Sequence, residues 1–388
     1  MRLLHTSDWH LGRTFHGASL LNEQRQVLQA IVDLVREHRV DAVLVAGDIY
    51  DRALPHVDAV RLFNWALGQL RATGARIVLS SGNHDSAARL GFAAELLDAA
   101  DVHVVTDLQR MVQPVVLSDS DHQVAIYGVP YLEPRMVMEE LEVEEPSHQA
   151  VVTAALERVQ SAHNNLCAEA AGPVHSVVLA HLFAAGGVGC DSERALSTGN
   201  LDVVAADLFA GFDYAALGHL HGKQRLQEHV RYSGSPLAYS FSEARHRKSV
   251  LLVETDASGV AGVEELELPV PRALAVLRGQ LEELLADPDL AWAEQAWCQV
   301  TLTDAQRPAE AMTRLRERFP DTLVLAFAPE GEETEAQPSY AQRLARAKST
   351  AEVCADFVEH VRERPVDEDE AHIIDDVLKR VREGRVSA

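Results

Sequence analysis

The chain has 388 residues, of which 47% are hydrophobic and 24% are charged, and its formal net charge is −24 at pH 7. These fractions are typical of a globular protein with one large domain and smaller appendages. The acidic balance disfavours broad adhesion to nucleic acid, but it does not exclude a nucleic-acid substrate, because bound cations and a local basic patch can offset the repulsion.

The sequence shows no pattern typical of membrane insertion or secretion. It contains no apolar run long enough to span a bilayer, and no signal-peptide pattern precedes the first predicted strand. The four cysteines are scattered without a Cys-x-x-Cys pair, which favours reduced thiols over a zinc site or a disulfide framework. We therefore expect a cytoplasmic protein.

The first part of the chain alternates predicted strands with predicted helices. Val27, Ile31 and Val35 recur at helical spacing, whereas residues 42–46 form a short apolar run typical of a strand buried on both faces. The predicted strands lie at 2–6, 42–46 and 76–79, and the predicted helices at 22–39 and 56–73. This alternation indicates an α/β fold.

Shorter predicted strands follow, interrupted by an acidic stretch from 132 to 172 that favours helix. These strands lie at 102–105, 112–117, 123–129, 175–180, 214–217, 230–232 and 249–254. Such a β-rich run indicates a sheet that is not purely parallel. We expect one continuous domain over residues 1–270.

A hinge is predicted at Leu268-Pro-Val-Pro271, because two closely spaced prolines favour an extended linker. The segments beyond it are a helix at 274–285, a strand at 297–302, a helix at 309–319 and a strand at 323–328. They predict a small α+β module over residues 271–330. An acidic linker is expected at 331–338, and two apolar stripes at helical spacing predict a helical tail at 339–388.

Polar residues of similar chemistry follow several of the predicted strands. Asp48 comes directly after strand 42–46 and Gly47, a glycine that allows a tight turn and close approach of the backbone to a ligand. Equivalent positions hold Asp8 and His10, Asn83 and His84, His181, and His219 and His221. Each residue alone has an ordinary structural explanation. Together, seven candidate oxygen and imidazole ligands, which are all of these residues except His84, include no cysteine and predict a site for a hard or borderline cation, not a structural zinc cage.

These residues also carry a family resemblance. The motifs are Asp8-Trp-His10, Gly47-Asp48, Gly82-Asn-His-Asp85, the lone His181 and Gly218-His-Leu-His221. They occur in the order characteristic of calcineurin-like metallophosphoesterases. With Asp8-Trp-His-Leu-Gly12, Gly47-Asp-Ile-Tyr-Asp51 and Tyr232-Ser-Gly-Ser-Pro236, the chain further resembles the SbcD family of nuclease subunits. The resemblance implies a β-sandwich flanked by helices (α/β/β/α), with a small α+β capping domain and a C-terminal helical tail.

The resemblance also implies two metal ions per chain. One would be held by Asp8, His10, Asp48 and His221, and the other by Asp48, Asn83, His181 and His219. A bridging Asp48 would reduce the repulsion between two close cations. Imidazole ligands are unusual for Mg²⁺, so Mn²⁺ is the expected metal, with Mg²⁺ as a substitute.

The same resemblance assigns roles around the metals. His84 would face the scissile phosphate, stabilise the transition state and protonate the leaving oxygen. Asp85 would orient His84. Archaeal and eukaryotic relatives tend to carry a histidine where Asp51 stands, so two roles stay open for Asp51: to support the metal ligands or to close its turn. Candidate DNA contacts are Arg13, His16, Arg89, Tyr232 and Ser233.

The implied activity is that of a DNA exonuclease and endonuclease acting on ends and hairpins in repair, recombination and replication. The chain has no Walker A motif, so any ATP dependence would come from a partner, an SbcC-type SMC-like ATPase bound through the C-terminal helices. The alternative for those helices is that they pack on their own domain. The resemblance also suggests a homodimer, a heterotetramer with the ATPase, and association with the nucleoid.

Two other functions are open to the same residues. A phosphatase or cyclic-nucleotide phosphodiesterase would use the same metal core, although the capping module and tail count against it. A non-catalytic scaffold is disfavoured because all seven candidate ligands and His84 are present.

Overall fold

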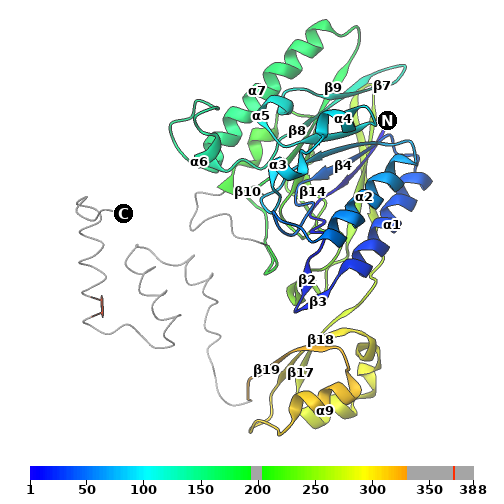
Figure 1. Cartoon of the computed structure of the whole chain (residues 1–388), viewed down its shortest axis with the longest axis vertical. Coiled ribbons are helices and arrows are strands. Elements are labelled where there is room, and N and C mark those ends of the chain that lie inside the picture. Colours follow the sequence, from blue (N-terminus) through cyan, green and yellow to red (C-terminus); the bar gives the residue numbers. More distant parts are fainter. Residues whose placement is uncertain (194–202, 330–369, 372–388) are drawn as a thin grey trace. The chain divides into compact units, whose positions relative to one another are not determined.

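Two six-stranded sheets, packed face to face, form the centre of the fold (Figure 1). The computed structural model describes residues 1–193, 203–329 and 370–371, and residues 1–193 and 203–329 belong to one structural unit. The predicted acidic linker and, apart from two residues, the predicted helical tail lie outside the described residues.

The first sheet has the order β16-β15-β1-β4-β5-β6 and the second the order β13-β14-β12-β9-β8-β7. The first is built from β16 (Gly259–Glu267), β15 (Ser249–Asp256), β1 (Arg2–Thr6), β4 (Ala42–Ala46), β5 (Arg76–Ser80) and β6 (Val102–Val105). The second is built from β13 (Gln224–Arg225), β14 (Val230–Tyr232), β12 (Tyr214–Gly218), β9 (Val174–His181), β8 (Gln123–Gly128) and β7 (Val115–Ser118). Two short pairs, β2 (Thr14–Phe15) with β3 (Ala18–Ser19) and β10 (Phe183–Ala184) with β11 (Val203–Val204), complete the strands of this part.

Strand β4 explains why the sheets stack. Its side chains alternate, so that Val43 and Val45 pack toward the helices, whereas Leu44 and Ala46 pack into the core between the sheets. A strand buried on both faces is an uninterrupted apolar run, which is the sequence pattern at this position. Within the first sheet β1, β4, β5 and β6 run parallel, so that their carboxyl ends meet at one edge.

Helices cover the outer faces of both sheets (Figure 1). On the first sheet these are α1 (Leu21–Glu37) and α2 (Val57–Arg71), and on the second α7 (His148–Glu169). Shorter helices are α3 (Ala87–Leu90), α4 (Ala94–Asp98), α5 (Leu108–Met111), α6 (Pro134–Val137), η2 (Ala206–Phe209) and η3 (Phe241–Glu243). The α/β/β/α layering expected from the sequence is confirmed.

Residues 274–327 form the small α+β module, and here one prediction was wrong. The segment expected as a helix at 274–285 is strand β17 (Leu274–Gly279) followed by α8 (Leu281–Ala286). In β17 only Ala275 and Leu277 are buried, and the strand pairs in parallel with β18 (Trp297–Leu302). Sheet pairing thus overrides the high helix propensity of Leu and Ala. The module is completed by η4 (Pro288–Gln295), α9 (Ala311–Arg318) and β19 (Thr322–Phe327).

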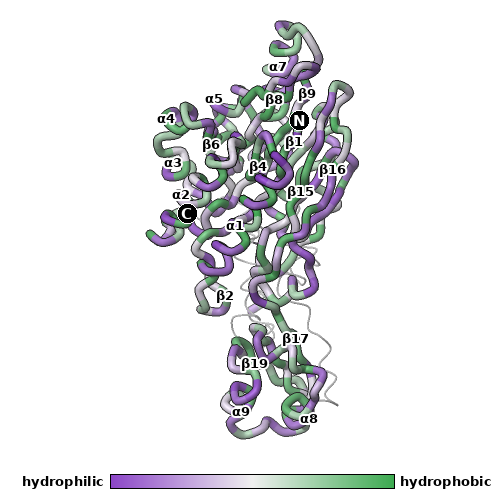
Figure 2. The backbone as a smooth tube through the Cα atoms, turned by 90° about the vertical axis from the view of Figure 1, so that its right-hand side faces the viewer, coloured by the Kyte–Doolittle hydropathy of each residue, from purple (hydrophilic) through white to green (hydrophobic). Residues whose placement is uncertain are grey.

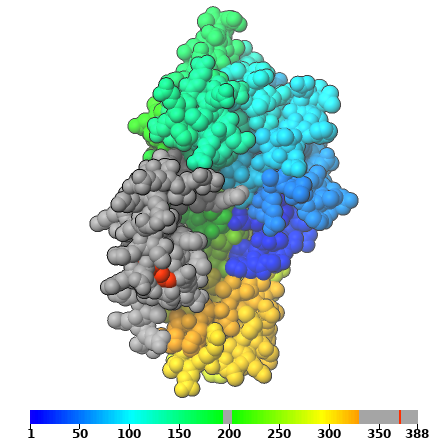
Figure 3. Space-filling view, turned by 60° about the vertical axis from the view of Figure 1, so that its left-hand side comes forward, coloured from blue at the N-terminus to red at the C-terminus, as the bar shows by residue number. Residues whose placement is uncertain are grey.

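The module contacts the N-terminal region through an aromatic stack. The rings of Phe15 and Trp297 lie 5.1 Å apart at an interplanar angle of 10°, and the Arg272 guanidinium lies 5.1 Å from the Trp297 ring centroid. In the space-filling view the module, in yellow and orange, borders the dark blue N-terminal residues (Figure 3).

Two further elements differ from the predictions. Strand β16 was not predicted, because its two glycines and three glutamates disguise an edge strand; Figure 2 shows it as more hydrophilic than its neighbour β15. Strand β7 begins after Pro114 and not at residue 112, which lies just beyond the unpredicted helix α5. Helices in the described part of the chain are too short or too polar to cross a membrane.

Candidate metal centre

The predicted ligands gather where the strands of both sheets end. Asp8 follows β1, Asp48 follows β4, His181 is the last residue of β9, and His219 follows β12. The backbone is left-handed at Asp8, His10, Asp48 and His219, with φ values of 53°, 43°, 48° and 108°. Such conformations are costly for residues other than glycine and cluster at functional sites.

Two glycines allow these loops to approach one another. A Cβ at Gly82 would lie 2.1 Å from Asp48 Oδ1, and a Cβ at Gly47, where φ is 80°, would lie 2.3 Å from His181 Nδ1. Both positions therefore exclude any larger residue. The role predicted for Gly47, close approach of the backbone to the site, has a direct structural basis.

Asp48 lies between two imidazoles. Its Oδ2 is 3.4 Å from His181 Nε2 and 3.5 Å from His10 Nε2, while its Oδ1 accepts a hydrogen bond of 2.9 Å from the His84 backbone amide. This hydrogen bond orients the Asp48 carboxylate and leaves Oδ2 facing both imidazole rings.

A first group of ligand atoms comes from Asp8, His10 and His221, which lie within 4.8 Å of one another. The Nε2 atoms of His10 and His221 are only 3.0 Å apart. The Asp8 carboxylate is oriented by Ser7 Oγ, at 2.6 Å from Oδ2, and by the His219 backbone amide, at 3.1 Å from both oxygens.

A second group comes from Asp8, Asp48 and His181. His181 Nδ1–H donates to the Ala46 carbonyl at 3.0 Å, which leaves Nε2 2.9 Å from Asn83 Oδ1. The His219 ring centroid lies 5.3 Å from that of His181. All seven predicted ligands are thus brought to one place.

The protonation states reflect a cluster of buried groups with few compensating charges. Burial, reinforced by the nearby charge of Asp48, raises the pKa of Asp8 to about 7. Burial lowers the pKa of His219 to about 3 and that of His10 well below its usual value. For His181 burial acts in the same direction, but the carboxylates of Asp48 and Asp8 outweigh it and raise the pKa to about 9.

This donor set fits divalent cations. Buried carboxylates and the imidazoles of His10 and His219, which burial keeps neutral, present lone pairs to a shared space, which is the chemistry of a hard or borderline metal site. Within the described residues, His10 Nδ1 is buried without a hydrogen-bond partner, and Asp51 Oδ1 lies 3.7 Å from it.

His84 stands at the rim of the centre, with 12% of its side chain exposed. Its Nδ1–H donates to the Asp51 carbonyl at 2.8 Å, so its Nε2 is free to face a substrate, 3.9 Å from Asp48 Oδ2. The expectation that Asp85 orients this ring is corrected by the structure. The Asp85 carboxylate accepts instead from the backbone amides of Ile49, Tyr50 and Gly82, and so ties the loops after β4 and β5 together.

The candidate DNA contacts separate into two sets. Tyr232 and Ser233 are buried: Tyr232 Oη donates to the Leu182 carbonyl at 2.9 Å, and Ser233 Oγ lies 3.0 Å from Ser7 Oγ. The structure therefore corrects their assignment as DNA contacts, because buried, internally bonded side chains cannot reach a ligand outside the fold.

Arg13, His16 and Arg89 are accessible. A cavity of about 550 Å³ beside the centre is lined by Arg13 and His16, by Ser240, and by Gln299 of the small module. Arg13 donates to the Ser192 carbonyl at 2.6 Å, while its NH1 lacks a hydrogen-bond partner among the described residues. Arg89 donates to the Ala53 carbonyl at 3.2 Å on the surface.

Sequence reasoning missed the residues that support His221, namely Ser192, Glu193, Glu243 and Lys248. They come from separate segments of the chain, Glu243 from η3, so no local spacing indicates them. Ser7, which supports Asp8, could have been found from its position next to a predicted ligand.

Comparison with known proteins agrees with the site. A family described as Calcineurin-like phosphoesterase matches residues 1–223, and one described as Type 5 capsule protein repressor C-terminal domain matches residues 270–362. The SbcD subunit of nuclease SbcCD from Escherichia coli (strain K12) is 32% identical over 330 residues, covering 81% of this chain and 82% of the relative. The protein of the same name from Staphylococcus saprophyticus is 29% identical over 330 residues, covering 84% of each chain.

Among solved structures, a dimetal phosphatase from Danio rerio matches 69% of this chain and 98% of its own, with 14% identity and a TM-score of 0.37, a similarity too low to support a conclusion. The family matches and the sequence relatives confirm the resemblance predicted from the motifs. The chain belongs to the calcineurin-like phosphoesterase family and, within it, to the group of SbcD subunits of SbcCD nucleases.

Proposed function

We propose that this chain is a divalent-metal-dependent DNA nuclease that hydrolyses phosphodiester bonds, as an exonuclease and as an endonuclease, at DNA ends and hairpins. The observation that carries the proposal is the position of Asp48 Oδ2, between His181 Nε2 at 3.4 Å and His10 Nε2 at 3.5 Å. A carboxylate oxygen shared by two imidazole-bearing groups is the arrangement that a bridged pair of cations requires. The relatives are named as the SbcD subunit of an SbcCD nuclease, which supports the choice of a nuclease.

The proposed ligands form two sets that share Asp48. One cation would be held by Asp8, His10, Asp48 and His221, and the other by Asp48, Asn83, His181 and His219. When bound, the cations would supply an activated water and offset charge on the phosphoryl oxygens. The share of imidazoles favours Mn²⁺, with Mg²⁺ as a substitute.

His84 supplies the proton chemistry. Because its Nδ1–H is held by the Asp51 carbonyl, Nε2 is the ring nitrogen left to face a substrate, and it lies 3.9 Å from Asp48 Oδ2. Protonated at Nε2, His84 donates a hydrogen bond to the phosphoryl group and then a proton to the leaving oxygen. Its partial exposure suits a residue that touches the substrate.

The cavity beside the centre supports a polynucleotide substrate. Arg13 lines this cavity with 16% of its side chain exposed and with its NH1 3.6 Å from Asp51 Oδ1, and its guanidinium supplies positive charge for a phosphate oxygen next to the ligands. We assign Arg13, His16 and Arg89 to contacts with the DNA backbone. Such a local patch suffices in a chain whose net charge is −24.

We further propose the domain and partner arrangement expected from the sequence. Residues 1–270 are the nuclease domain, 271–330 the capping domain, 331–338 a linker, and 339–388 a tail that binds an SbcC-type ATPase. The nuclease is proposed to act as a homodimer within a heterotetramer. The family match that continues from residue 270 to residue 362 supports a shared C-terminal architecture.

The test compares substrates with purified full-length chain. We expect Mn²⁺-dependent cleavage of a DNA hairpin and of linear duplex, lost on chelation with EDTA and restored by Mn²⁺. A cyclic nucleotide and a phosphopeptide serve as the competing substrates. If these are turned over and DNA is not, the chain is a phosphodiesterase or phosphatase instead.

A further inference from the structure

His221 is held from three sides by residues that do not belong to the predicted ligand set. Its Nδ1 lies 2.7 Å from Ser192 Oγ, and its backbone amide donates to Glu193 Oε1 at 2.6 Å. Its carbonyl accepts a hydrogen bond of 2.9 Å from Lys248 Nζ. Both the ring and the backbone of this residue are thus fixed.

Glu243 is the centre of this support. Its Oε1 accepts from Ser192 Oγ at 2.5 Å, and its Oε2 accepts from Lys248 Nζ at 2.5 Å. The side chains of Glu243 and Lys248 are 0% and 6% exposed. A buried carboxylate requires such pairing, and the Lys248 ammonium supplies the compensating charge.

The direction of the hydrogen bonds follows from the chemistry of the groups. The ion-paired Glu243 carboxylate only accepts, so the Ser192 hydroxyl must donate its proton to Glu243. The hydroxyl oxygen is then free only as an acceptor toward His221, which must carry its proton on Nδ1. The lone pair of His221 consequently lies on Nε2, the atom 3.0 Å from His10 Nε2 in the candidate metal centre.

A different role for Glu243 is less well supported. Together with Cys190 and His246 it forms a group whose potential ligand atoms lie within 4.8 Å of one another. However, Lys248 already neutralises the carboxylate, and burial together with nearby carboxylates raises the pKa of the Cys190 thiol, which keeps it protonated. A further cation at this group would compete with the ammonium of Lys248.

We propose that Ser192, Glu243 and Lys248 are positioning residues that hold His221 as the Nδ1–H tautomer and thereby set the affinity of one metal of the pair. The inference rests on the proposed function only in that the centre binds divalent cations. Partners that orient metal-ligating histidines typically contribute about 10–100-fold to metal affinity or activity.

The tautomer can be tested without metal. In metal-free protein labelled with ¹⁵N-histidine, two-bond ¹H–¹⁵N correlations should show His221 protonated on Nδ1, with its signals assigned by their absence in His221→Gln. Ser192→Ala should abolish the preference for Nδ1. The matched control is Ser242→Ala, which removes a nearby hydroxyl that bonds to Ser240 Oγ at 2.5 Å and to the Asp191 amide at 3.3 Å. An Nε2–H tautomer in the parent chain, or an unchanged His221 in Ser192→Ala, would overturn the proposal.

Metal affinity supplies the second readout. By calorimetric titration with Mn²⁺, Ser192→Ala should weaken one of two binding events about 10–100-fold and leave the other within about 2-fold, whereas Ser192→Thr should restore the weakened event. Equal constants in Ser192→Ala and the parent chain would refute the positioning role. If the parent chain itself binds no Mn²⁺, the proposed function fails, and the tautomer experiment still reports on the hydrogen-bond relay separately.

The charged pair requires a double substitution. Glu243→Gln alone would leave the buried Lys248 ammonium without a carboxylate partner and destabilise the fold. The informative variant therefore combines Glu243→Gln with Lys248→Met. It should unfold cooperatively near the parent melting temperature, yet show the same loss of tautomer preference and of one Mn²⁺ affinity as Ser192→Ala. A folded double variant with parental tautomer and affinities would contradict the role of the pair.

Discussion

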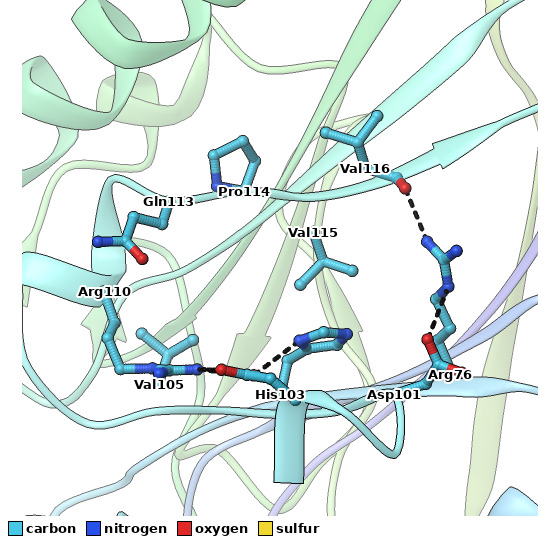
Figure 4. Close-up of a pocket in the computed structure, with 10 residues that line it drawn as sticks. Arg76, Asp101, His103, Val105, Arg110, Gln113, Pro114, Val115 and Val116 are labelled. Carbon is cyan, nitrogen blue, oxygen red and sulfur yellow. Dashed lines mark hydrogen bonds and ion pairs between the residues drawn. The ribbon is translucent and has the colours of Figure 1, made fainter. Parts of the chain in front are cut away.

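Two charged regions at the edges of the same sandwich differ in how their charges are satisfied. In a cavity of about 390 Å³ beside β6 and β7, opposite charges face each other (Figure 4). Arg110 bonds to both Asp98 oxygens at 2.8 and 2.9 Å, and Arg76 Nε lies 3.4 Å from Asp101. The His103 ring bonds to Asp98 as well, at 2.9 Å.

The metal centre has the same residue types without this balance. Its carboxylates and imidazoles face one another, and in the contacts of the described residues neither Asp8 nor Asp48 is paired with an arginine or a lysine. The His10 and His221 rings approach with two nitrogens at 3.0 Å, a contact that at most one proton can bridge. A cluster whose acidic and basic side chains pair with one another is therefore structural, whereas a cluster whose negative charges need an added cation is a binding site.

The largest expected effect is that of Asp48→Asn. The substitution preserves the shape and the bond to the His84 amide through the amide oxygen, but it removes the charge from the oxygen between His10 and His181. We expect DNA cleavage to fall below detection and both Mn²⁺ affinities to fall, measured by hairpin cleavage and calorimetry. If the variant bound two Mn²⁺ ions with the affinities of the parent, the charge of Asp48 would be dispensable, and the unpaired charge of the centre would no longer distinguish it from the balanced cavity.

His84→Ala should separate metal binding from turnover. Since the His84 ring contacts the Asp51 carbonyl and lies 3.9 Å from Asp48 Oδ2, its loss leaves the proposed ligands in place. We expect kcat to fall about 10²–10⁴-fold, as for loss of a general acid, with two Mn²⁺ still bound. His84→Gln is the matched variant that retains a hydrogen-bond donor but no transferable proton; turnover close to that of the parent in His84→Gln would exclude proton transfer.

Much of this centre was predictable, because its residues follow recognisable strands. The uninterrupted apolar run at Ala42–Ala46 predicts a buried strand, and the position of Asp48 after it predicts a side chain at the sheet edge. What the chain order could not show was which polar residues far apart in sequence meet. The bonds from Ser192 to Glu243 and from Lys248 to His221 span 51 and 27 residues, and no periodicity encodes them.

Errors in the fold prediction have a related cause. Strand β16 is recognised as a strand only by its pairing with β15, and β17 only by its pairing with β18. The prediction of Tyr232 and Ser233 as DNA contacts was wrong for the same reason, because their burial depends on tertiary contacts with Leu182 and Ser7. Local pattern therefore identifies central strands and their ends, whereas edge strands and supporting contacts depend on tertiary structure.

Asp8→Asn should show how much the unpaired charge of the metal centre lowers the free energy of unfolding of the metal-free protein. Burial raises the pKa of Asp8 to about 7, above the usual 3.8, so the folded state binds more protons than the unfolded state between these values. The preferential protonation of Asp8 in the folded state therefore contributes to the free energy of unfolding below pH 3.8, and this contribution is lost as the pH rises through about 7. At pH 8 without metal, we expect the variant to be more stable than the parent by a few kcal/mol, measured by urea unfolding, while Mn²⁺ no longer stabilises it. A destabilised metal-free variant would show that the Ser7 and His219 bonds outweigh the burial of charge.

Asp98→Asn makes the opposite test in the balanced cavity and has the smallest expected effect. It removes the charge that pairs with Arg110 and His103, so the metal-free protein should lose about 1 kcal/mol, because the Asp98 side chain is about one third exposed and solvent screens the pair. Mn²⁺ affinities and DNA cleavage should equal those of the parent chain, since none of the predicted ligands contacts Asp98. Urea unfolding and calorimetry on the same preparation check both statements. A change in Mn²⁺ binding would mean that the two regions are coupled, and the distinction between a self-sufficient charge cluster and a metal site would not hold in this fold.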